Sequence, residues 1–370
     1  MVTTNQQTND RVGTARIGIV GAGTSGVYLA QLLIQQGFQV DVFERSPQPR
    51  TEGCGILIVQ DGMKALYQGS PSICQKIIQA GAPVTKFEFR NLRGGVISSE
   101  PVQYAEGELP GMLVHRKDIL EALLEGLPAD CIHGNAELQS VSQREDGVIA
   151  CFQDGRQWEG DVLVGADGIL SKVRESVVSG VQLCYLGDLV WRGIVEDSTF
   201  CCDGEFFVYT RGRGIYANFF DLGGGRTHWG FFIEVDQSAV QGRVVLAQNP
   251  SIPAQELAKL PADARAIIEA TSIEQVVSRY SYDIDPLPRL HHGRVVLIGD
   301  AAHAKSPSRA RGMTSGWEDA IALAQHLATT PDVKAALAAF EAERMPIVHE
   351  YQRTSRDISR RIGRQHKPAA

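Results

Sequence analysis

The feature that most restricts how this chain can fold is a glycine-rich turn near its amino terminus. Gly21-Ala22-Gly23-Thr24-Ser25-Gly26 follows the apolar run Ile17 to Val20 and opens a segment with apolar residues at helical spacing. Glycines here permit a tight turn and let backbone N–H groups at a helix N-terminus approach a pyrophosphate. Glu44 ends the next alternating segment, 18 residues beyond Gly26, where a carboxylate can accept hydrogen bonds from a ribose 2′-OH. This order predicts a βαβ unit that binds a dinucleotide.

Further pieces of the same domain are expected far along the chain. Apolar runs at 161–164 and 294–298 are typical of buried strands in a parallel sheet. Apolar residues recur at helical spacing in 116–127 and in 317–327. We therefore expect the dinucleotide domain to be assembled from separated stretches of sequence.

A second kind of sheet interrupts these stretches. Alternating or aromatic-rich segments joined by glycine-rich turns predict successive, mostly antiparallel strands. Ten of the 26 aromatic residues fall between Phe200 and Phe232, where they suit either a sheet core or a flat, apolar substrate. The predicted strands are 86–90, 206–209, 215–222 and 227–235.

Charge and composition exclude several kinds of partner. A net charge of −7 and a pI near 5.8 give no reason to expect binding to nucleic acid. The seven cysteines form no CxxC pair, and their odd number fits poorly with a secreted disulfide framework, so we expect a cytoplasmic protein. Residues 1–15 have no apolar signal-peptide core, and no run approaches the ~18 apolar residues of a membrane span. The histidines form no ligand cluster, so no metal is expected.

Two further motifs make a family resemblance specific. Asp167-Gly168 follows the strand expected at 161–164, and Gly299-Asp300-Ala301-Ala302-His303 ends the strand expected at 294–298. Pro307, Gly312 and Glu318-Asp319-Ala320 follow. With the glycine-rich turn, these segments resemble the three fingerprints of the flavoprotein aromatic hydroxylases, FAD-dependent monooxygenases similar to para-hydroxybenzoate hydroxylase. The resemblance covers about residues 15–345.

The resemblance implies an α/β fold with two interlocked domains. A Rossmann-type FAD-binding domain, similar to that of glutathione reductase, would contain an inserted, mostly antiparallel β-sheet substrate domain. The expected FAD-binding parts are 15–80, 104–180 and 280–345, the substrate domain is 81–103 and 181–279, and a C-terminal helix and tail occupy 346–370.

The resemblance also implies a resident FAD and assigns residues to it. The glycine-rich turn would hold the pyrophosphate, Glu44 the adenosine ribose, and Asp300 the ribityl chain or a ribose. By the same resemblance, Asp167 would serve FAD and a visiting NAD(P)H together. A single GxGxxG motif leaves no second nucleotide domain, so NAD(P)H would bind transiently. The expected cofactor-binding residues are Gly21, Gly23, Thr24, Ser25, Gly26, Glu44, Arg45, Arg116, Asp167, Asp300, Gly312 and Met313.

The implied reaction uses NAD(P)H and O₂ to hydroxylate or epoxidise a small aromatic, heterocyclic or polyene substrate through a C4a-hydroperoxyflavin. The backbone at Pro307 would neighbour the reacting flavin atom, and His303 is expected to be structural rather than an acid or base. We expect a monomer or a homodimer. Candidate substrate contacts, each of which could equally be a structural residue of the sheet, are Arg192, Arg213, Tyr216 and His228.

Two other functions are compatible with the fold. A flavin-dependent halogenase working with a separate flavin reductase shares the GxGxxG core, although the Trp-x-Trp-x-Ile-Pro signature of many halogenases is absent. A non-redox binding protein of the same fold would not need Asp167-Gly168 or Gly299-Asp300. The basic stretch from Arg353 to Lys367 fits a solvated surface helix better than a membrane-binding one, because its apolar positions are sparse.

One segment departs from the family pattern. After Pro307 the family usually has Gly-Gln-Gly, whereas this chain has Ala310-Arg311-Gly312, preceded by Arg309. Alanine disfavours positive φ, so the loop is expected to take another path or not to require that conformation. The two arginines would either lie beside the flavin, where they could stabilise an anionic reduced form or attract an anion, or point into solvent.

Overall fold

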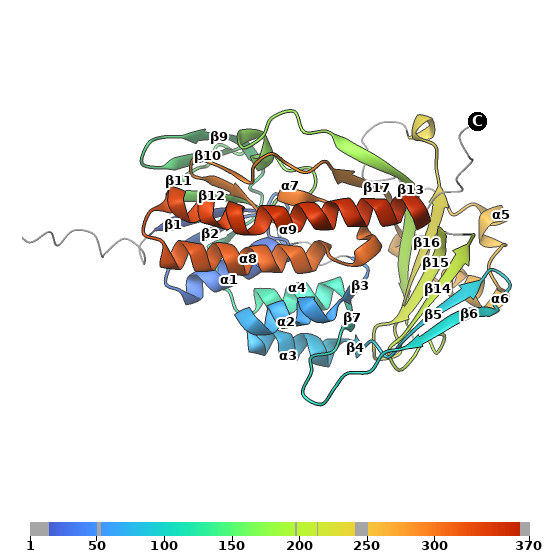
Figure 1. The fold of residues 1–370 in the computed structure, drawn as a ribbon. Helices are drawn as coiled ribbons and strands as arrows, with labels where there is room; N and C mark the ends of the chain where they lie inside the picture. Colours follow the sequence, from blue (N-terminus) through green and yellow to red (C-terminus); the bar gives the residue numbers. More distant parts are fainter. Residues whose placement is uncertain (1–14, 50–52, 197, 213, 241–250, 363–370) are drawn as a thin grey trace, which may run out of the picture.

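The computed structural model describes residues 15–49, 53–196, 198–212, 214–240 and 251–362 (Figure 1). Its larger part is built on a six-stranded sheet in the order β18-β19-β12-β1-β2-β8, in which only β18 is antiparallel to its neighbour. The strands are β1 (Arg16–Val20), β2 (Gln39–Phe43), β8 (Ile132–His133), β12 (Val162–Gly165), β18 (His291–His292) and β19 (Val295–Leu297).

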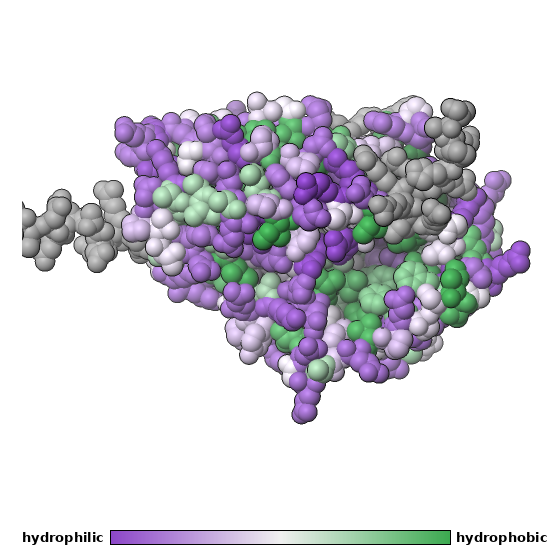
Figure 2. Space-filling view, viewed as in Figure 1, coloured by the Kyte–Doolittle hydropathy of each residue, from purple (hydrophilic) through white to green (hydrophobic). Residues whose placement is uncertain are grey.

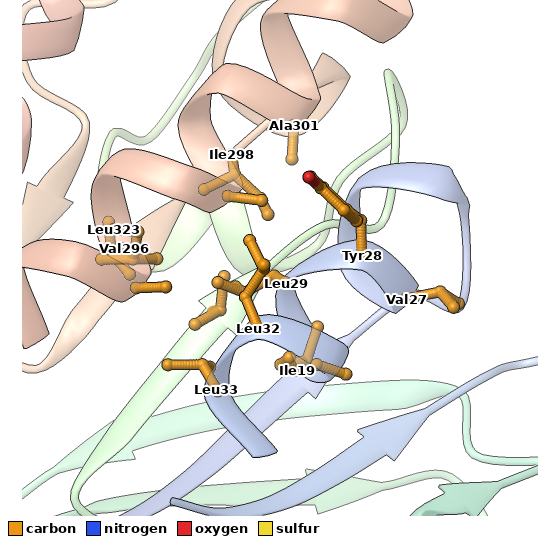
Figure 3. Close-up of a cluster of buried hydrophobic side chains, with 14 of the residues drawn as sticks. Ile19, Val27, Tyr28, Leu29, Leu32, Leu33, Val296, Ile298, Ala301 and Leu323 are labelled. Atoms are coloured by element: carbon orange, nitrogen blue, oxygen red, sulfur yellow. The ribbon is translucent and has the colours of Figure 1, made fainter. Parts of the chain in front are cut away.

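Helices cover one face of this sheet. α1 (Thr24–Gln35) packs against α8 (Gly312–Thr329), and α8 packs against the long helix α9 (Val333–Ile362). Buried apolar side chains of β1, α1, β19 and α8 meet in one core, as Figure 3 shows around Ile19, Leu29 and Leu323. This core fixes α1 against the end of β1, where the glycine-rich turn lies.

A small antiparallel sheet covers the opposite face. It consists of β9 (Leu138–Gln143), β10 (Val148–Phe152) and β11 (Gln157–Gly160). Trp158 of β11 fills the space above Gly18, where an added Cβ would lie 2.7 Å from the indole ring. The parallel sheet is therefore covered on both faces, which is typical of parallel sheets in α/β proteins.

A layer of short elements connects this part to the second sheet. It contains α2 (Gln60–Gly69), α3 (Pro71–Ala80), α4 (Arg116–Leu124) and a three-stranded sheet of β3 (Gly55–Ile58), β7 (Met112–His115) and β4 (Ala82–Pro83). Short 3₁₀ turns are η1 (Ala129–Cys131), η2 (Val173–Ser176), η3 (Gln237–Ala239), η4 (Ile273–Gln275) and η5 (Pro307–Arg309).

The second sheet has seven strands in the order β17-β13-β16-β15-β14-β5-β6, and all its pairs are antiparallel except β14 with β5. The strands are β5 (Lys86–Asn91), β6 (Val96–Pro101), β13 (Leu183–Val195), β14 (Glu205–Arg211), β15 (Gly214–Asp221), β16 (Thr227–Glu234) and β17 (Val277–Ile284).

The two faces of this sheet contact different parts of the protein. We call the outer face the one that packs on α5 (Ala254–Leu257) and α6 (Ala262–Glu269), away from the helical domain (Figure 1). Its buried rings include Trp191, Phe207 and Phe231. The inner face faces the rest of the protein, and its Phe206 and Phe220 cluster with Leu113 of β7. Most of the aromatic residues noted in the sequence therefore form sheet core.

Most predicted elements are confirmed, and several limits need correction. The strands predicted at 86–90, 206–209, 215–222 and 227–235 are β5, β14, β15 and β16, and 161–164 and 294–298 contain β12 and β19. The helix expected at 116–127 ends at Leu124, and the one expected from Trp317 begins already at Gly312. The expected domain limits at 280 and 345 fall inside β17 and α9.

The basic carboxyl-terminal stretch belongs to α9 as far as Ile362, and 363–367 lie outside the described residues. Its Arg356 pairs with Asp283 at 2.7 Å and with Asp285 at 2.6 Å, which ties α9 to the end of β17. None of the helices described is both long and apolar enough to cross a membrane. In the same residues no group of three or more His, Cys, Asp or Glu side chains is placed to hold a metal ion.

Candidate active site

The turn between β1 and α1 exposes backbone donors. Gly21 has a φ of +110°, and an added Cβ would lie 2.4 Å from the Ala166 carbonyl oxygen, so glycine is required. Gly23 is the N-cap of α1, and an added Cβ there would meet nothing within 4 Å. Among the described residues no side chain caps α1, and its first turn holds no acidic residue. The first N–H groups of the helix are therefore available to a diphosphate.

The Glu44 carboxylate is fixed beside this turn. Its Oε2 accepts a hydrogen bond from the Ala22 N–H at 3.1 Å, and its Oε1 accepts one from the Ser46 N–H at 2.9 Å. A carboxylate can accept about four hydrogen bonds, so both oxygens can also bind hydroxyl groups of a ribose. Arg45, the next residue, is exposed.

The motif from Gly299 to His303 packs against the glycine-rich turn at Ser25. Added Cβ atoms on Gly299 and Gly316 would lie 2.9 and 2.0 Å from the Ser25 hydroxyl oxygen, so both glycines make room for α1. Gly299 has a φ of +59° and is the N-cap of α7 (Asp300–His303). Asp300 is exposed at the start of this helix. The two motifs, far apart in sequence, thus form one surface.

Asp167 lies against the same turn, but its carboxylate is used within its own loop. An added Cβ on Gly21 would lie 2.9 Å from the Asp167 Cα. The carboxylate accepts hydrogen bonds from the Ser171 hydroxyl at 2.5 Å and from the backbone N–H groups of Lys172 at 2.7 Å and Val173 at 3.2 Å. Burial raises the pKa of Asp167, although these hydrogen bonds by themselves would lower it. The structure therefore gives Asp167 a local role in holding η2 against the turn.

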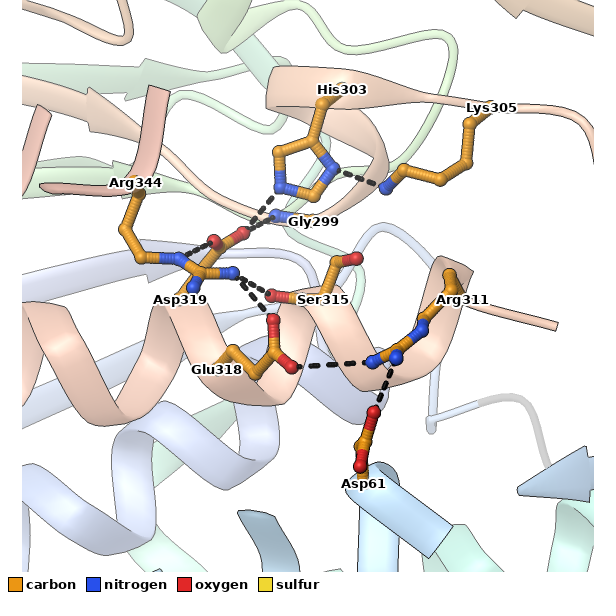
Figure 4. Close-up of polar contacts among 9 residues, drawn as sticks. All are labelled: Asp61, Gly299, His303, Lys305, Arg311, Ser315, Glu318, Asp319 and Arg344. Carbon is orange, nitrogen blue, oxygen red and sulfur yellow. Dashed lines mark hydrogen bonds and ion pairs between the residues drawn. The ribbon is translucent and has the colours of Figure 1, made fainter. Parts of the chain in front are cut away.

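Behind the Gly299 turn lies a buried network of charged residues (Figure 4). Asp319 of α8 accepts hydrogen bonds from the Gly299 N–H at 3.0 Å, His303 Nε2 at 2.5 Å and Arg344 Nε at 2.9 Å. Burial alone would raise the pKa of Asp319, but His303, Arg344 and the Gly299 N–H hold it well below its usual range. Asp319 therefore stays ionised and anchors the turn that carries Asp300.

Lys305 extends this network and is almost completely buried. Its ammonium donates to His303 Nδ1 at 2.7 Å, because the other ring nitrogen carries the proton given to Asp319. Burial lowers the pKa of Lys305 to about 8, against the attraction of Asp300 and Asp319. Burial likewise lowers the pKa of His303. His303 therefore has the structural role expected from the sequence.

The loop after Pro307 corrects the expectation for Ala310. Pro307 is exposed and opens η5, and Ala310 adopts a φ of +51° and a ψ of +28°, which is the left-handed conformation. The loop thus keeps the conformation that glycine favours, at a cost of roughly 1–2 kcal/mol for a residue with a Cβ. Gly312 then begins α8, and Met313 is half-buried.

The two arginines of this loop lie in different environments. Arg311 forms an ion pair with Asp61, lies 3.6 Å from Glu318, and stacks over the Tyr351 ring at 5.0 Å. Only 16% of its side chain is exposed, so it is not solvated, and two carboxylates balance its charge. Arg309 is exposed but donates to the Thr354 hydroxyl at 2.9 Å. Both residues therefore fasten the loop to its neighbours.

The candidate substrate residues fall on opposite faces of the seven-stranded sheet. Arg192 and His228 lie on the inner face, where His228 Nδ1 accepts from the Gly55 N–H at 3.1 Å. Burial, with repulsion from Arg192 and His115, lowers the pKa of His228 well below its usual value, so the ring is neutral. Tyr216 lies on the outer face and donates to Glu256 of α5, so it cannot contact a substrate on the inner face. Arg213 lies outside the described residues.

The surface between the helical domain and the seven-stranded sheet is hollowed, and hydrophobic side chains gather there (Figure 2). Arg116 begins α4, and its N–H donates to the Cys54 carbonyl at 3.1 Å. An added Cβ on Gly53 would lie 3.0 Å from the Arg116 side chain, so these residues are closely packed.

A comparison with known proteins identifies the family. Residues 14–355 match the family described as FAD binding domain. The chain belongs to this family. It is 30% identical over 351 residues to the 3-amino-4-hydroxybenzoate 2-monooxygenase of Streptomyces cremeus, covering 93% of this chain and 86% of the relative. It is 29% identical over 338 residues to the aurachin C monooxygenase/isomerase of Stigmatella aurantiaca, covering 90% and 86%.

A solved structure agrees with the fold. Klebsiella pneumoniae HpxO complexed with FAD and uric acid superimposes with a TM-score of 0.84 at 23% identity, over 93% of this chain and 88% of that one. The chain is an FAD-dependent monooxygenase of the flavoprotein aromatic hydroxylase family. The relatives favour this function over the halogenase and the non-redox binding protein. The free first turn of α1, the Glu44 carboxylate and the exposed Asp300 together fit FAD.

The sequence did not indicate that Lys305, Asp319 and Arg344 belong to one buried network of charged residues. Asp319 was noted only as part of a motif, and neither Lys305 nor Arg344 lies in a pattern that marks a buried charge. A lysine two residues after His303, in a run whose other members from Ala301 to Ser306 are all small, is the one local signal that could have indicated it.

Replacing Glu44 with Ala is expected to weaken FAD binding about 5- to 150-fold, the equivalent of about 1–3 kcal/mol for a lost charge-assisted hydrogen bond. Fluorescence titration of the FAD-free protein with FAD measures the dissociation constant. Glu159→Ala is the control. Glu159 lies on β11, away from the turn, and its exposed carboxylate pairs with Arg144. Equal affinity of the Glu44 and Glu159 variants would contradict the role of Glu44.

Proposed function

We propose that this chain is a single-component monooxygenase that oxidises NAD(P)H itself and inserts oxygen into a small, planar aromatic or heterocyclic substrate. Two relatives are named for 3-amino-4-hydroxybenzoate and for aurachin C, which supports an aromatic substrate class. For each oxygen atom inserted, the reaction consumes NAD(P)H, a proton and O₂, and the second oxygen atom leaves as water.

The observation that carries this proposal is the position of the cofactor surface opposite the inner face of the sheet. Gly55 of β3 packs against the inner face, since its N–H donates to His228 and an added Cβ would lie 2.5 Å from the Phe220 ring, and the carbonyl of the preceding Cys54 accepts from the N–H of Arg116, an expected cofactor residue. FAD, when bound, supplies electron transfer from NAD(P)H to O₂. The chain itself must hold the cofactor, orient the substrate and exclude water.

We assign each group of expected cofactor residues to one part of FAD. The first turn of α1, with Thr24, Ser25 and the three glycines, binds the pyrophosphate. Glu44 and Arg45 would hold the adenosine ribose, and Asp300, whose turn is held by the Gly299–Asp319 hydrogen bond, would hold the ribityl chain. Arg116, Gly312 and Met313 would border the flavin end, and the backbone at Pro307 would neighbour the reacting flavin atom. Asp167 supports the turn from behind, and its contact with NAD(P)H remains a proposal.

The test is steady-state turnover of the purified, FAD-loaded protein without any added reductase. We expect NADPH or NADH oxidation and O₂ uptake that rise at least tenfold when a suitable aromatic acid or heterocycle is present, with a product heavier by one oxygen atom. A protein that reacts only with separately supplied reduced flavin would overturn the single-component proposal. Turnover with aliphatic substrates alone would overturn the substrate class.

A further inference from the structure

Lys305 is a buried cation whose hydrogen bond goes to a neutral group. Its side chain lies in the network behind the Gly299 turn, and the residue is only 8% exposed (Figure 4). The ammonium donates to His303 Nδ1 at 2.7 Å, and burial lowers the pKa of His303, so the ring brings no opposite charge. Within the part of the chain that the structure describes, Lys305 forms no ion pair. Buried lysines are normally paired, so this ammonium calls for a counter-ion.

Two carboxylates of the same network are held by other cations and donors. Asp319 accepts from His303 Nε2 at 2.5 Å and from Arg344 Nε at 2.9 Å. Glu318 pairs with the same arginine at 2.8 Å. Both carboxylates attract Lys305 from a distance, but neither is in contact with it.

The third carboxylate, Asp300, has no partner of its own. It is exposed at the start of α7 and forms no hydrogen bond or ion pair with any described residue. Asp300 and His303 are three residues apart in this one-turn helix, so they lie on the same side of it, where His303 meets the Lys305 ammonium. Of the attractions that act on Lys305, that of Asp300 is the largest. One charge of this pair thus faces the expected cofactor surface, and the other is buried behind it.

Binding of FAD would change the surroundings of Asp300. An exposed carboxylate is solvated by water, whereas a carboxylate covered by a cofactor loses that water. Without a nearby cation this desolvation is unfavourable, and the attraction between opposite charges grows as water is excluded. Lys305 provides such a cation, and its own burial is complete before FAD arrives.

We propose that Lys305 is a positioning residue for FAD that acts through Asp300. Its buried ammonium is the counter-ion that keeps the Asp300 carboxylate ionised when the cofactor covers it, and the His303–Asp319 pair orients the ammonium. This inference rests on the assignment of Asp300 to FAD in the proposed function. It adds a residue that does not touch the cofactor but decides how tightly the cofactor is held.

The pairing makes FAD binding depend on pH. The pKa of Lys305 is about 8 before FAD binds, and a stronger attraction to Asp300 raises it in the complex. The complex therefore holds the proton more tightly, so FAD affinity is highest below pH 8 and falls as the pH rises through the pKa of Lys305 in the complex. The groups that face the ammonium are Asp300 and His303 of α7, Glu318 and Asp319 of α8, and Arg344 of α9.

The test measures how tightly FAD is held, by the rise in flavin fluorescence when the loaded protein is diluted. At pH 7, Lys305→Met should weaken FAD binding about tenfold, and Asp300→Asn should weaken it by about as much or more. The double variant should bind FAD within about threefold of Asp300→Asn, because Lys305 has no further effect once Asp300 has lost its charge. Lys86→Met is the matched control, since this half-buried lysine pairs with Glu205 on the seven-stranded sheet, and it should leave FAD binding unchanged.

Two further measurements separate this role from a purely structural one. Between about pH 7 and about pH 9.5 the FAD affinity of the wild type should fall toward that of Lys305→Met, whose affinity should stay constant. After removal of FAD, the full-length Lys305→Met protein should be more stable than the wild type at pH 7, because an unpaired ammonium is no longer buried. Weaker FAD binding by a more stable protein cannot result from loss of the fold.

Three results would contradict this role of Lys305. They are unchanged FAD affinity in Lys305→Met, an equally large effect of Lys305→Met in the Asp300→Asn background, and a difference between Lys305→Met and the wild type that does not vary with pH. Normal FAD binding by Asp300→Asn would remove the assignment of Asp300 and this inference with it. Turnover assays test the proposed function separately. If an aromatic substrate still stimulates NAD(P)H oxidation while Lys305→Met binds FAD normally, the monooxygenase stands and the role of Lys305 falls.

Discussion

Asp319→Asn is expected to lower the free energy of unfolding by about 3–5 kcal/mol, because removing one partner of a buried ion pair leaves the other charge uncompensated. Asp319 is fully buried and accepts from Arg344, His303 and the Gly299 N–H. The amide keeps the shape of the side chain but loses the charge that balances Arg344. Urea denaturation at saturating FAD, followed by tryptophan fluorescence, measures the change.

Glu343→Gln provides the matched control for this substitution. Glu343 lies on α9 next to Arg344, but its side chain is 51% exposed and pairs with His326 at the surface. An exposed pair contributes about 0–1 kcal/mol, so the control should unfold close to the wild type. Similar losses in the two variants would show that the buried network is not the source of the stability. We also expect weaker FAD binding in Asp319→Asn, since Asp319 holds the turn that carries Asp300.

Lys305→Met is expected to change stability in a pH-dependent way. The folded pKa of Lys305 is about 8 against an ordinary value of 10.5, so between these two values the unfolded chain binds more protons than the folded one. Wild-type stability therefore rises with pH across this window, and the full cost of burying the ammonium is present below pH 8. Methionine removes this cost but also removes the hydrogen bond to His303.

At pH 7 we therefore expect the Met variant to be more stable than the wild type by ~2 kcal/mol. Removing the ammonium, whose lowered pKa costs the wild type ~3 kcal/mol, outweighs the loss of a hydrogen bond worth ~1 kcal/mol. The advantage should shrink steadily between pH 8 and pH 10.5. Unfolding free energies at several pH values measure it, with Lys172→Met, at an exposed ammonium paired with Glu137, as the control. A difference between Lys305→Met and the wild type that stays constant over this range would show that the Lys305 ammonium is not destabilised by burial.

The sequence by itself determined the parts of the site that depend on neighbours along the chain. The glycine-rich turn, α1 and Glu44 form one βαβ unit, in which Gly21 donates to the Phe43 carbonyl at 2.8 Å and Glu44 accepts from Ala22. The spacing of glycines and apolar residues encodes this geometry, because each residue type is required by a local backbone conformation or by a helix or strand period.

Only the tertiary structure decided which side chains share a surface. Tyr216 is the extra residue of a bulge, since Tyr209 pairs with Ala217 while Thr210 pairs with Ile215. A bulge changes the phase of the alternation, so the face that Tyr216 occupies cannot be counted from its neighbours. Arg311 meets Asp61 from 250 residues away, and Lys305 is buried by elements that come together only on folding. Burial and charge pairing of this kind depend on contacts between distant segments, which no local period records.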